Sequence, residues 1–175
     1  RVNVTINGVP YNDSESMGVW WVNLPDFASS IESIQIQRGV GTSTNGSASF
    51  GGSLNIQTNA ASDIASFEIN NTLGSFSSIK NSVGFSTGFI NDKFELSGRL
   101  SRIKSGGYID RSGSKLRSYF LQGVYKDSNT LLKLLNFAGH ELTDQAWFGI
   151  DASNLESNRK YNPAGEYYDK NGNIQ

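Results

Sequence analysis

The chain has 175 residues, with 15 Lys and Arg against 16 Asp and Glu, so its formal net charge of -1 gives no electrostatic reason to expect a nucleic-acid partner. The absence of Cys excludes disulfides, thiolate zinc sites and a cysteine nucleophile, and a single His excludes a metal site built from several histidines. No run approaches the roughly 18 consecutive apolar residues of a membrane helix, so a helical membrane protein is excluded. The 19 Gly, 25 Ser and 18 Asn disfavour helices and favour strands and turns.

The first third of the chain, through about Thr58, predicts a mixture of strands, loops and one short helix. Residues 2–6 alternate apolar and polar side chains and end at Asn7-Gly8, which indicates a short strand and a tight turn. A polar loop follows over residues 10–22. Residues 24–31 predict a short helix with proline in its first turn, and the alternation then resumes in a strand that ends near Arg38.

From residue 66 onward, apolar and polar side chains alternate with a period of two. The predicted strands cover residues 66–73, 79–89, 93–100, 119–125 and 130–142. The fifth alternates poorly because Lys133 interrupts an apolar flank. We expect short turns after the second and fourth strands and longer connections after the first, third and fifth. This rhythm is typical of a membrane β-barrel, and the strand lengths favour it over a β-sandwich, in which strands cluster near five or six residues.

Three sequence motifs carry a family resemblance. Residues 31–41, IESIQIQRGVG, and 46–58, GSASFGGSLNIQT, resemble the end of the plug domain of TonB-dependent outer-membrane receptors. Residues 6–10, INGVP, resemble the strand and turn before the exposed plug loop of that family. Ala146-Trp147 and residues 158–167, NRKYNPAGEY, resemble an external loop of one branch of it. The chain departs from the family at Val40, where Pro is usual, and at Thr44-Asn45, where Leu-Tyr is common.

The resemblance implies a β-rich fold, namely a fragment of a large antiparallel transmembrane β-barrel with part of a mixed α/β plug domain. Residues 1–58 would be the C-terminal part of the plug, residues 59–65 a linker, and residues 66–175 the first five barrel strands with part of an external loop. Five antiparallel strands cannot close a barrel alone. We therefore expect the plug and strand segments to make few contacts that would be stable without the rest of the barrel.

The resemblance also implies an outer-membrane receptor of a Gram-negative bacterium that imports a scarce nutrient, such as a ferric siderophore, haem, cobalamin or a glycan. Its expected partners are the inner-membrane TonB complex, reached through a TonB box upstream of Arg1, outer-membrane lipid, the nutrient and, for some substrates, a surface lipoprotein. No enzymatic activity, cofactor, metal or nucleic acid is expected. The alternative function is a secreted β-sandwich that binds a glycan or a protein.

Ligand contact is expected on the apical plug loop and on the external loop. The plug-loop candidates are Trp20, Trp21, Tyr11, Asn12, Glu15 and Met17. Two adjacent indoles offer stacking surface and hydrogen-bond donors to a bulky ligand, although one of them could instead pack against the barrel wall. The external-loop candidates are Trp147, Tyr161 and Tyr167.

Two charged residues of the plug are expected to form ion pairs. These are Glu32 and Arg38, which we expect to pair with each other or with the barrel charges Glu68, Glu95 or Arg99. Such pairs could hold a gate, or could simply neutralise buried charge. Gly51-Gly52 is not a phosphate-binding loop because the Walker lysine is missing, and bent strands explain these glycines.

Overall fold

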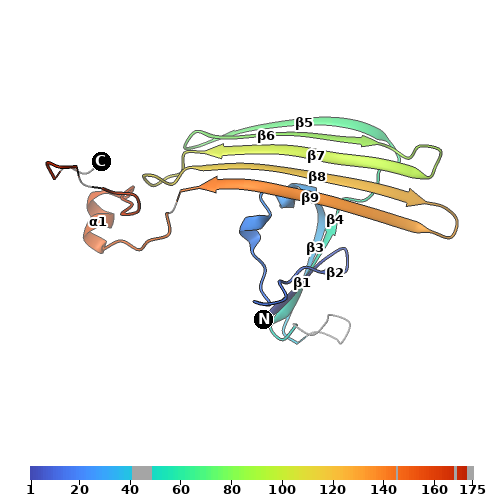
Figure 1. The fold of residues 1–175 in the computed structure, drawn as a ribbon, viewed down its shortest axis with the longest axis horizontal. Coiled ribbons are helices and arrows are strands. Elements are labelled where there is room, and N and C mark those ends of the chain that lie inside the picture. Colours follow the sequence, from blue (N-terminus) through green and yellow to red (C-terminus); the bar gives the residue numbers. More distant parts are fainter. Residues whose placement is uncertain (41–48, 145, 168, 173–175) are drawn as a thin grey trace.

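The computed structural model describes residues 1–40, 49–144, 146–167 and 169–172. Residues 46–48 of the plug-like motif, and Thr44 and Asn45, therefore lie outside the described residues. The strands form a four-stranded sheet in the order β2-β1-β4-β3 and a five-stranded sheet in the order β5-β6-β7-β8-β9. The first sheet projects from one face of the second (Figure 1). We call residues 1–58 the plug segment and β5 to β9 the wall.

The plug sheet is mixed. Its strands are β1 (Val2–Ile6), β2 (Val9–Pro10), β3 (Ile31–Arg38) and β4 (Gly52–Thr58). Strand β1 pairs in parallel with β4, and β3 pairs antiparallel with β4. The predicted turn at Asn7-Gly8 is present, with φ values of 51° and 81°. Gly52 has a φ of 151°, and a Cβ there would lie 2.5 Å from the Gln37 carbonyl oxygen, so close backbone packing requires glycine.

The predicted short helix is replaced by two 3₁₀ turns. The turn η1 spans Trp21–Asn23 and η2 spans Phe27–Ser30. Between them, Asp26 has a φ of 55°, in the left-handed region, which prevents a continuous right-handed helix. This kink directs η2 toward the wall and buries Phe27 and Ser30.

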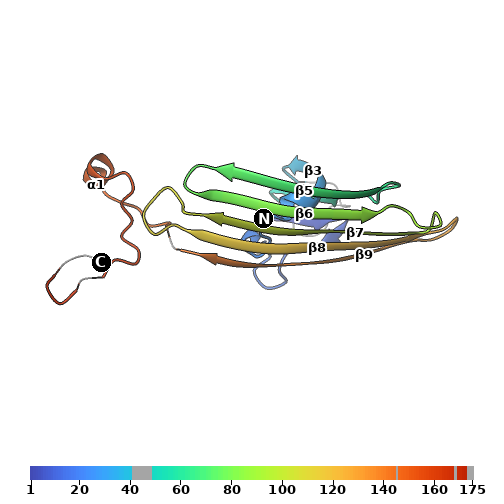
Figure 2. The same cartoon turned by 90° about the horizontal axis from the view of Figure 1, so that it is seen from above.

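The five predicted wall strands are present and fully antiparallel. They are β5 (Ala65–Gly74), β6 (Ser78–Thr87), β7 (Phe94–Ser105), β8 (Ser114–Lys126) and β9 (Leu131–Thr143). Figure 2 shows them side by side from above. In the described part of the chain the sheet is open, with β5 and β9 at its edges. A short helix, α1 (Ala152–Ser157), follows beyond the end of the strands (Figure 1).

One expected connection is wrong. A long connection was predicted after the first wall strand, but only residues 75–77 separate β5 from β6, whereas residues 88–93 separate β6 from β7. The reason is local: Phe76 and Ser77 have φ values of 58° and 56°, and positive φ values at consecutive residues suit a tight hairpin. No helix in the described ranges is long and apolar enough to span a membrane.

The wall has two distinct faces. The plug-facing face includes Phe120, Gln122 and Val124, which are buried. Residues alternate between faces along each strand, so the intervening positions point outward. Apolar residues predominate on that outward face, with exposed fractions from 36% to 80%, at Phe67, Ile69, Leu73, Val83, Phe85, Leu96, Leu100, Leu121, Leu132 and Leu134. A β-sandwich would cover this face with its second sheet, whereas here the second sheet lies on the other side.

Candidate functional site

The plug segment meets the wall through an aromatic cluster centred on Phe27. The Phe27 side chain is 6% exposed, and its ring centroid lies 4.9 Å from that of Phe137 on β9 and 6.3 Å from that of Phe120 on β8. Phe120 and Phe137 are direct partners across the two strands. Val4 and Ile56 of the plug sheet belong to the same buried cluster. The two segments therefore share one continuous apolar core.

Beside this cluster, Asp26 forms two ion pairs with the wall. Its Oδ1 lies 2.6 Å from Lys80 Nζ, and its Oδ2 lies 2.6 Å from Arg99 Nη1. Arg99 Nη2 also donates to the Asp26 carbonyl oxygen at 2.7 Å, and Ser101 Oγ donates to Oδ2. The Asp26 and Arg99 side chains are only 7% and 12% exposed. Such buried charges need a complete set of partners, and the contacts of Asp26 with Lys80, Arg99 and Ser101 form such a set.

Opposing influences set the pKa of Asp26. Burial is the largest and raises it, but hydrogen bonds from Lys80, Ser101 and Ser29, together with the charge of Arg99, outweigh burial. The net result is a pKa below the usual value of 3.8. Asp26 is therefore ionised at neutral pH, and the contact is a true ion pair.

Gly139 on β9 allows the turn that contains Pro25 and Asp26 to pack closely against the wall. A Cβ at Gly139 would lie 2.5 Å from Pro25 Cδ, so the proline ring occupies the space that any side chain would need. On the same face of β9, Lys133 Nζ donates to Thr58 Oγ1 at 3.0 Å and to the Asn59 carbonyl oxygen at 3.3 Å. This contact explains why a lysine interrupts the apolar run: it reaches the end of the plug sheet.

The predicted ion-pair residues lie elsewhere. Glu32 Oε2 accepts a hydrogen bond from the Ala60 amide at 3.0 Å, and Arg38 is exposed. Among the described residues, neither forms an ion pair. Glu68 and Glu95 accept hydrogen bonds from residues of the wall itself, and Arg99 pairs with Asp26. The physical reason is placement: Asp26 sits in the turn that touches the wall, whereas Glu32 faces the linker.

Two of the plug-loop candidates hold the loop together. Asn12 Oδ1 accepts from the Val4 amide at 2.7 Å, and its Nδ2 donates to the carbonyl oxygens of Val2 and Met17, both at 3.0 Å. Tyr11 is half-buried, and its ring centroid lies 6.5 Å from that of Phe137. These two side chains are therefore used for folding and docking. Glu15 is exposed, and its amide donates to Asp13 Oδ1 at 3.1 Å.

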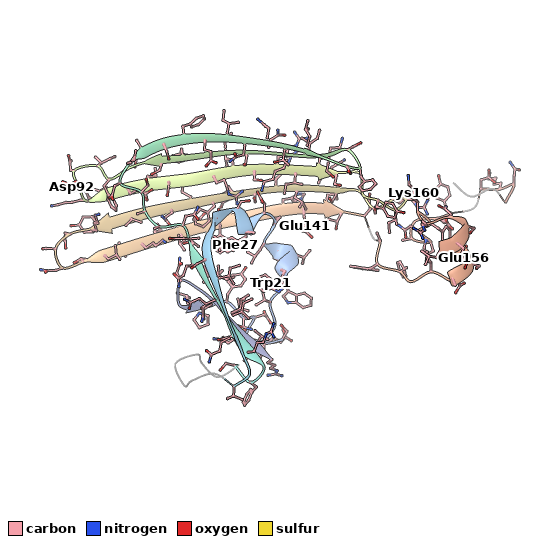
Figure 3. The ribbon with its side chains drawn as sticks, turned by 180° about the vertical axis from the view of Figure 1, so that it is seen from behind. Trp21, Phe27, Asp92, Glu141, Glu156 and Lys160 are labelled. Carbon is pink, nitrogen blue, oxygen red and sulfur yellow. The ribbon has the colours of Figure 1, made fainter. Side chains whose placement is uncertain are left out.

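The two adjacent indoles remain accessible. Trp20 and Trp21 are 61% and 51% exposed. Trp21 begins η1, which lies on the side of the plug sheet nearer α1, and Figure 3 shows it farther from the wall than Phe27. Trp21, Met17 and Arg38 line one cavity of about 580 Å³, together with residues of β1, β3 and β4 and with Gly51-Gly52. The structure thus brings three candidates together, while Trp20 lies outside that lining.

The external-loop candidates belong to a separate substructure beyond the strand ends. Arg111 Nε donates to the Ala164 carbonyl oxygen at 2.8 Å, and Asn162 Nδ2 donates to the Asp110 carbonyl oxygen at 2.8 Å. These bonds fasten the connection 106–113 to residues 160–166. Tyr161 Oη donates to Glu166 Oε2 at 3.2 Å. Trp147 and Tyr167 are 76% and 64% exposed and remain available.

No protein-family model and no curated protein matches the chain. Solved structures do match. The ferripyoverdine receptor of the outer membrane of Pseudomonas aeruginosa, bound to ferripyoverdine, is 10% identical with a TM-score of 0.64, and the match covers 99% of this chain and 21% of the receptor. The pyoverdine receptor FpvA from P. aeruginosa PAO1, bound to pyoverdine, is 11% identical with a TM-score of 0.63, over 79% of this chain and 20% of the receptor.

The siderophore receptor PirA from Acinetobacter baumannii is 21% identical with a TM-score of 0.53, and the match covers 81% of this chain and 24% of the receptor. The chain spans only about a fifth to a quarter of the length of these receptors. At these identities the likeness concerns the fold. The chain therefore has the β-rich fold of a plug segment and the adjoining barrel wall of outer-membrane siderophore receptors.

Proposed function

We propose that this chain is part of a TonB-dependent receptor of a Gram-negative outer membrane that imports a ferric siderophore. The observation that carries the proposal is the two-sided wall: a plug segment is docked on one face, and the other face is apolar and exposed. A transmembrane barrel strand needs this division, with lipid against the apolar side and the lumen against the other. Large barrels of this kind hold a plug in their lumen.

A ferric siderophore is preferred over haem, cobalamin or a glycan. The support comes from the solved structures of the same fold, two of which are described as bound to pyoverdine or ferripyoverdine and one as a siderophore receptor. The accessible aromatic side chains of the plug loop suit a bulky, partly planar ligand. We propose that Trp20, Trp21 and Met17 form the plug part of its binding surface, and that Trp147 and Tyr167 contribute from the external segment.

The contact between plug and wall is suited to displacement. Beside Asp26, a cavity of about 210 Å³ lies between η2, the linker and the wall, and six serines contribute to its lining: Ser29, Ser30, Ser62, Ser66, Ser86 and Ser97. Small hydroxyl groups exchange protein hydrogen bonds for water at little net cost. The main barriers to moving the plug are then the Phe27 cluster and the Asp26 ion pairs. Energy for that movement would come from the TonB complex.

The proposal is tested with the full-length protein. Binding is measured for ferric siderophores, haem, cobalamin and oligosaccharides, with Trp20→Ala and Trp21→Ala as variants and Val22→Ala as a matched control at a neighbouring exposed residue. Truncation of an aromatic anchor typically costs at least about 2 kcal/mol, or about 30-fold in affinity. We expect such a loss for a ferric siderophore in at least one Trp variant, and little change in the control.

Two results would refute the proposal. One is binding of haem, cobalamin or a glycan with no binding of any ferric siderophore. The other is extraction of the full-length protein as a soluble protein without detergent, because an outward apolar face of this kind requires lipid.

A further inference from the structure

The outward face of the wall carries a group of cations at one end of its strands. Arg102 and Lys104 on β7 lie directly opposite Arg117 and Lys115 on β8. All four side chains are exposed. Like charges placed opposite each other across strands are destabilising, so this arrangement needs a counter-charge. We call these four residues the cationic end.

The wall itself supplies no counter-charge. By the strand register, the outward positions of β5 to β9 include no Asp or Glu, because the wall's glutamates, Glu68, Glu95 and Glu141, all share the plug-facing face. Within the described ranges, no ion pair or side-chain hydrogen bond involves the cationic end. An anionic group of another molecule would supply the counter-charge that these residues lack.

A groove on the same face joins these charges to apolar surface. It has a volume of about 400 Å³, and its outward-facing lining combines basic and apolar side chains: Arg102, Arg117, His140, Leu100, Tyr119 and Ala138. The apolar part continues into the exposed apolar residues of the wall. An acyl chain would therefore find an apolar site in the groove, and the adjacent cations would be placed to bind a phosphate group.

The position of this group along the strands indicates its depth in a membrane. The strands at the cationic end lead into the connection 106–113, the segment 144–172 and the tight turn 75–77, which packs against Gly106. Residues 88–93 and 127–130 form the connections at the other end, and both are shorter than 106–113. In outer-membrane barrels, long connections are extracellular and short turns periplasmic. The cationic end would therefore lie at the headgroup level of the outer leaflet, where the lipid is a glycolipid with phosphorylated sugars.

We propose that the cationic end binds the phosphate groups of an outer-leaflet glycolipid, whose acyl chains lie along Leu100 and Tyr119. Arginine is suited to this role because its planar guanidinium can donate two parallel hydrogen bonds to one phosphate. The proposal rests on the outer-membrane location in the proposed function, but it concerns lipid on the outside of the barrel and not the imported ligand.

The test is a native mass-spectrometry titration of the full-length protein in detergent. The lipids are lipid A with two phosphates, lipid A with one phosphate, phosphatidylglycerol and phosphatidylethanolamine. Each cation near an anionic lipid surface contributes about fivefold to binding, so Arg102→Gln with Arg117→Gln should weaken binding of the two-phosphate lipid A by about 30-fold. Arg102→Lys with Arg117→Lys keeps the charges and should retain most of the affinity.

The matched control is Lys93→Gln, which removes an exposed cation from the connection at the opposite end. It should leave lipid A binding unchanged. Equal affinity of the double Gln variant and the parent protein would overturn the proposal, as would equal binding of phosphatidylglycerol and two-phosphate lipid A. Siderophore binding is measured on the same variants and should not change. A protein that binds lipid A through its phosphates but binds no siderophore would refute the proposed function alone.

Discussion

Replacing Asp26 by Asn tests whether the ion pairs hold the plug segment against the wall. The change keeps the size of the side chain but leaves Arg99 and Lys80, which are 12% and 29% exposed, without a counter-charge. Removing one partner of a buried ion pair costs about 3–5 kcal/mol. Because water can reach Lys80, we take the lower end, about 3 kcal/mol, which weakens docking by about 150-fold.

Hydrogen exchange measured by mass spectrometry on the full-length protein reports this docking. The Asn59 amide donates to the Ser30 carbonyl oxygen at 3.1 Å and the Ser29 amide to that of Asp26 at 3.2 Å, so peptides covering these bonds lose protection when the turn leaves the wall. We expect exchange there to rise by about 150-fold in the Asp26→Asn variant.

The control for this experiment is Asp63→Asn, which removes the ion pair with Lys126. That pair is 3.8 Å long and its Asp side chain is 85% exposed, so its loss should raise exchange by no more than about fivefold. If Asp26→Asn raises exchange no more than Asp63→Asn does, the Asp26 ion pairs do not stabilise the docked plug, and the reasoning is refuted.

Three further predictions follow from the same contacts and from the outward face. Docking lowers the pKa of Asp26, so the ionised carboxylate stabilises the docked plug fully above the usual pKa of 3.8, and this stabilisation is lost as the pH falls through the lowered pKa. At that low pH, the protection of residues 24–31 should fall in the parent protein and not in Asp26→Asn. Gly139→Ala places a Cβ 2.5 Å from Pro25 Cδ and should weaken docking by about 1–3 kcal/mol in the same exchange assay, whereas Gly123→Ala, with open space around it, should not. Leu121→Arg, in the middle of β8 on the outward face, should lower the free energy of unfolding in bilayers by about 2–4 kcal/mol, and a change within about 0.5 kcal/mol would place that face in water.

The wall could be predicted from the sequence because each strand carries its own period-two signal. Lys133 shows the limit of that signal. In the sequence it only weakens the alternation of the fifth strand, and its function depends on Thr58 and Asn59, about 75 residues earlier, reaching the same place. No local pattern encodes a contact over such a separation. The tight turn at Phe76 and Ser77 was missed for another reason: these residue types rarely adopt positive φ values.

The plug contacts were harder to predict. Glu32 and Arg38 are charged residues of a recognisable motif, whereas Asp26 lies in what looked like an ordinary helical turn. Its role depends on a left-handed backbone conformation, and on the packing of Phe27 beside it. The signal that could have found it lies on the wall: Lys80 and Arg99 fall on the face that carries serines and glycines, and both need an acidic partner.

One rule accounts for the cations of the wall on both faces. Arg99 and Arg102 are three residues apart on β7, so they point to opposite faces. On the plug-facing side, Arg99, Lys80 and Lys133 each reach an oxygen of the plug segment. On the outward side, Arg102 and its neighbours reach none among the described residues. The same strand therefore needs negative groups on both sides: the plug supplies them inside, and a phosphorylated lipid would supply them outside.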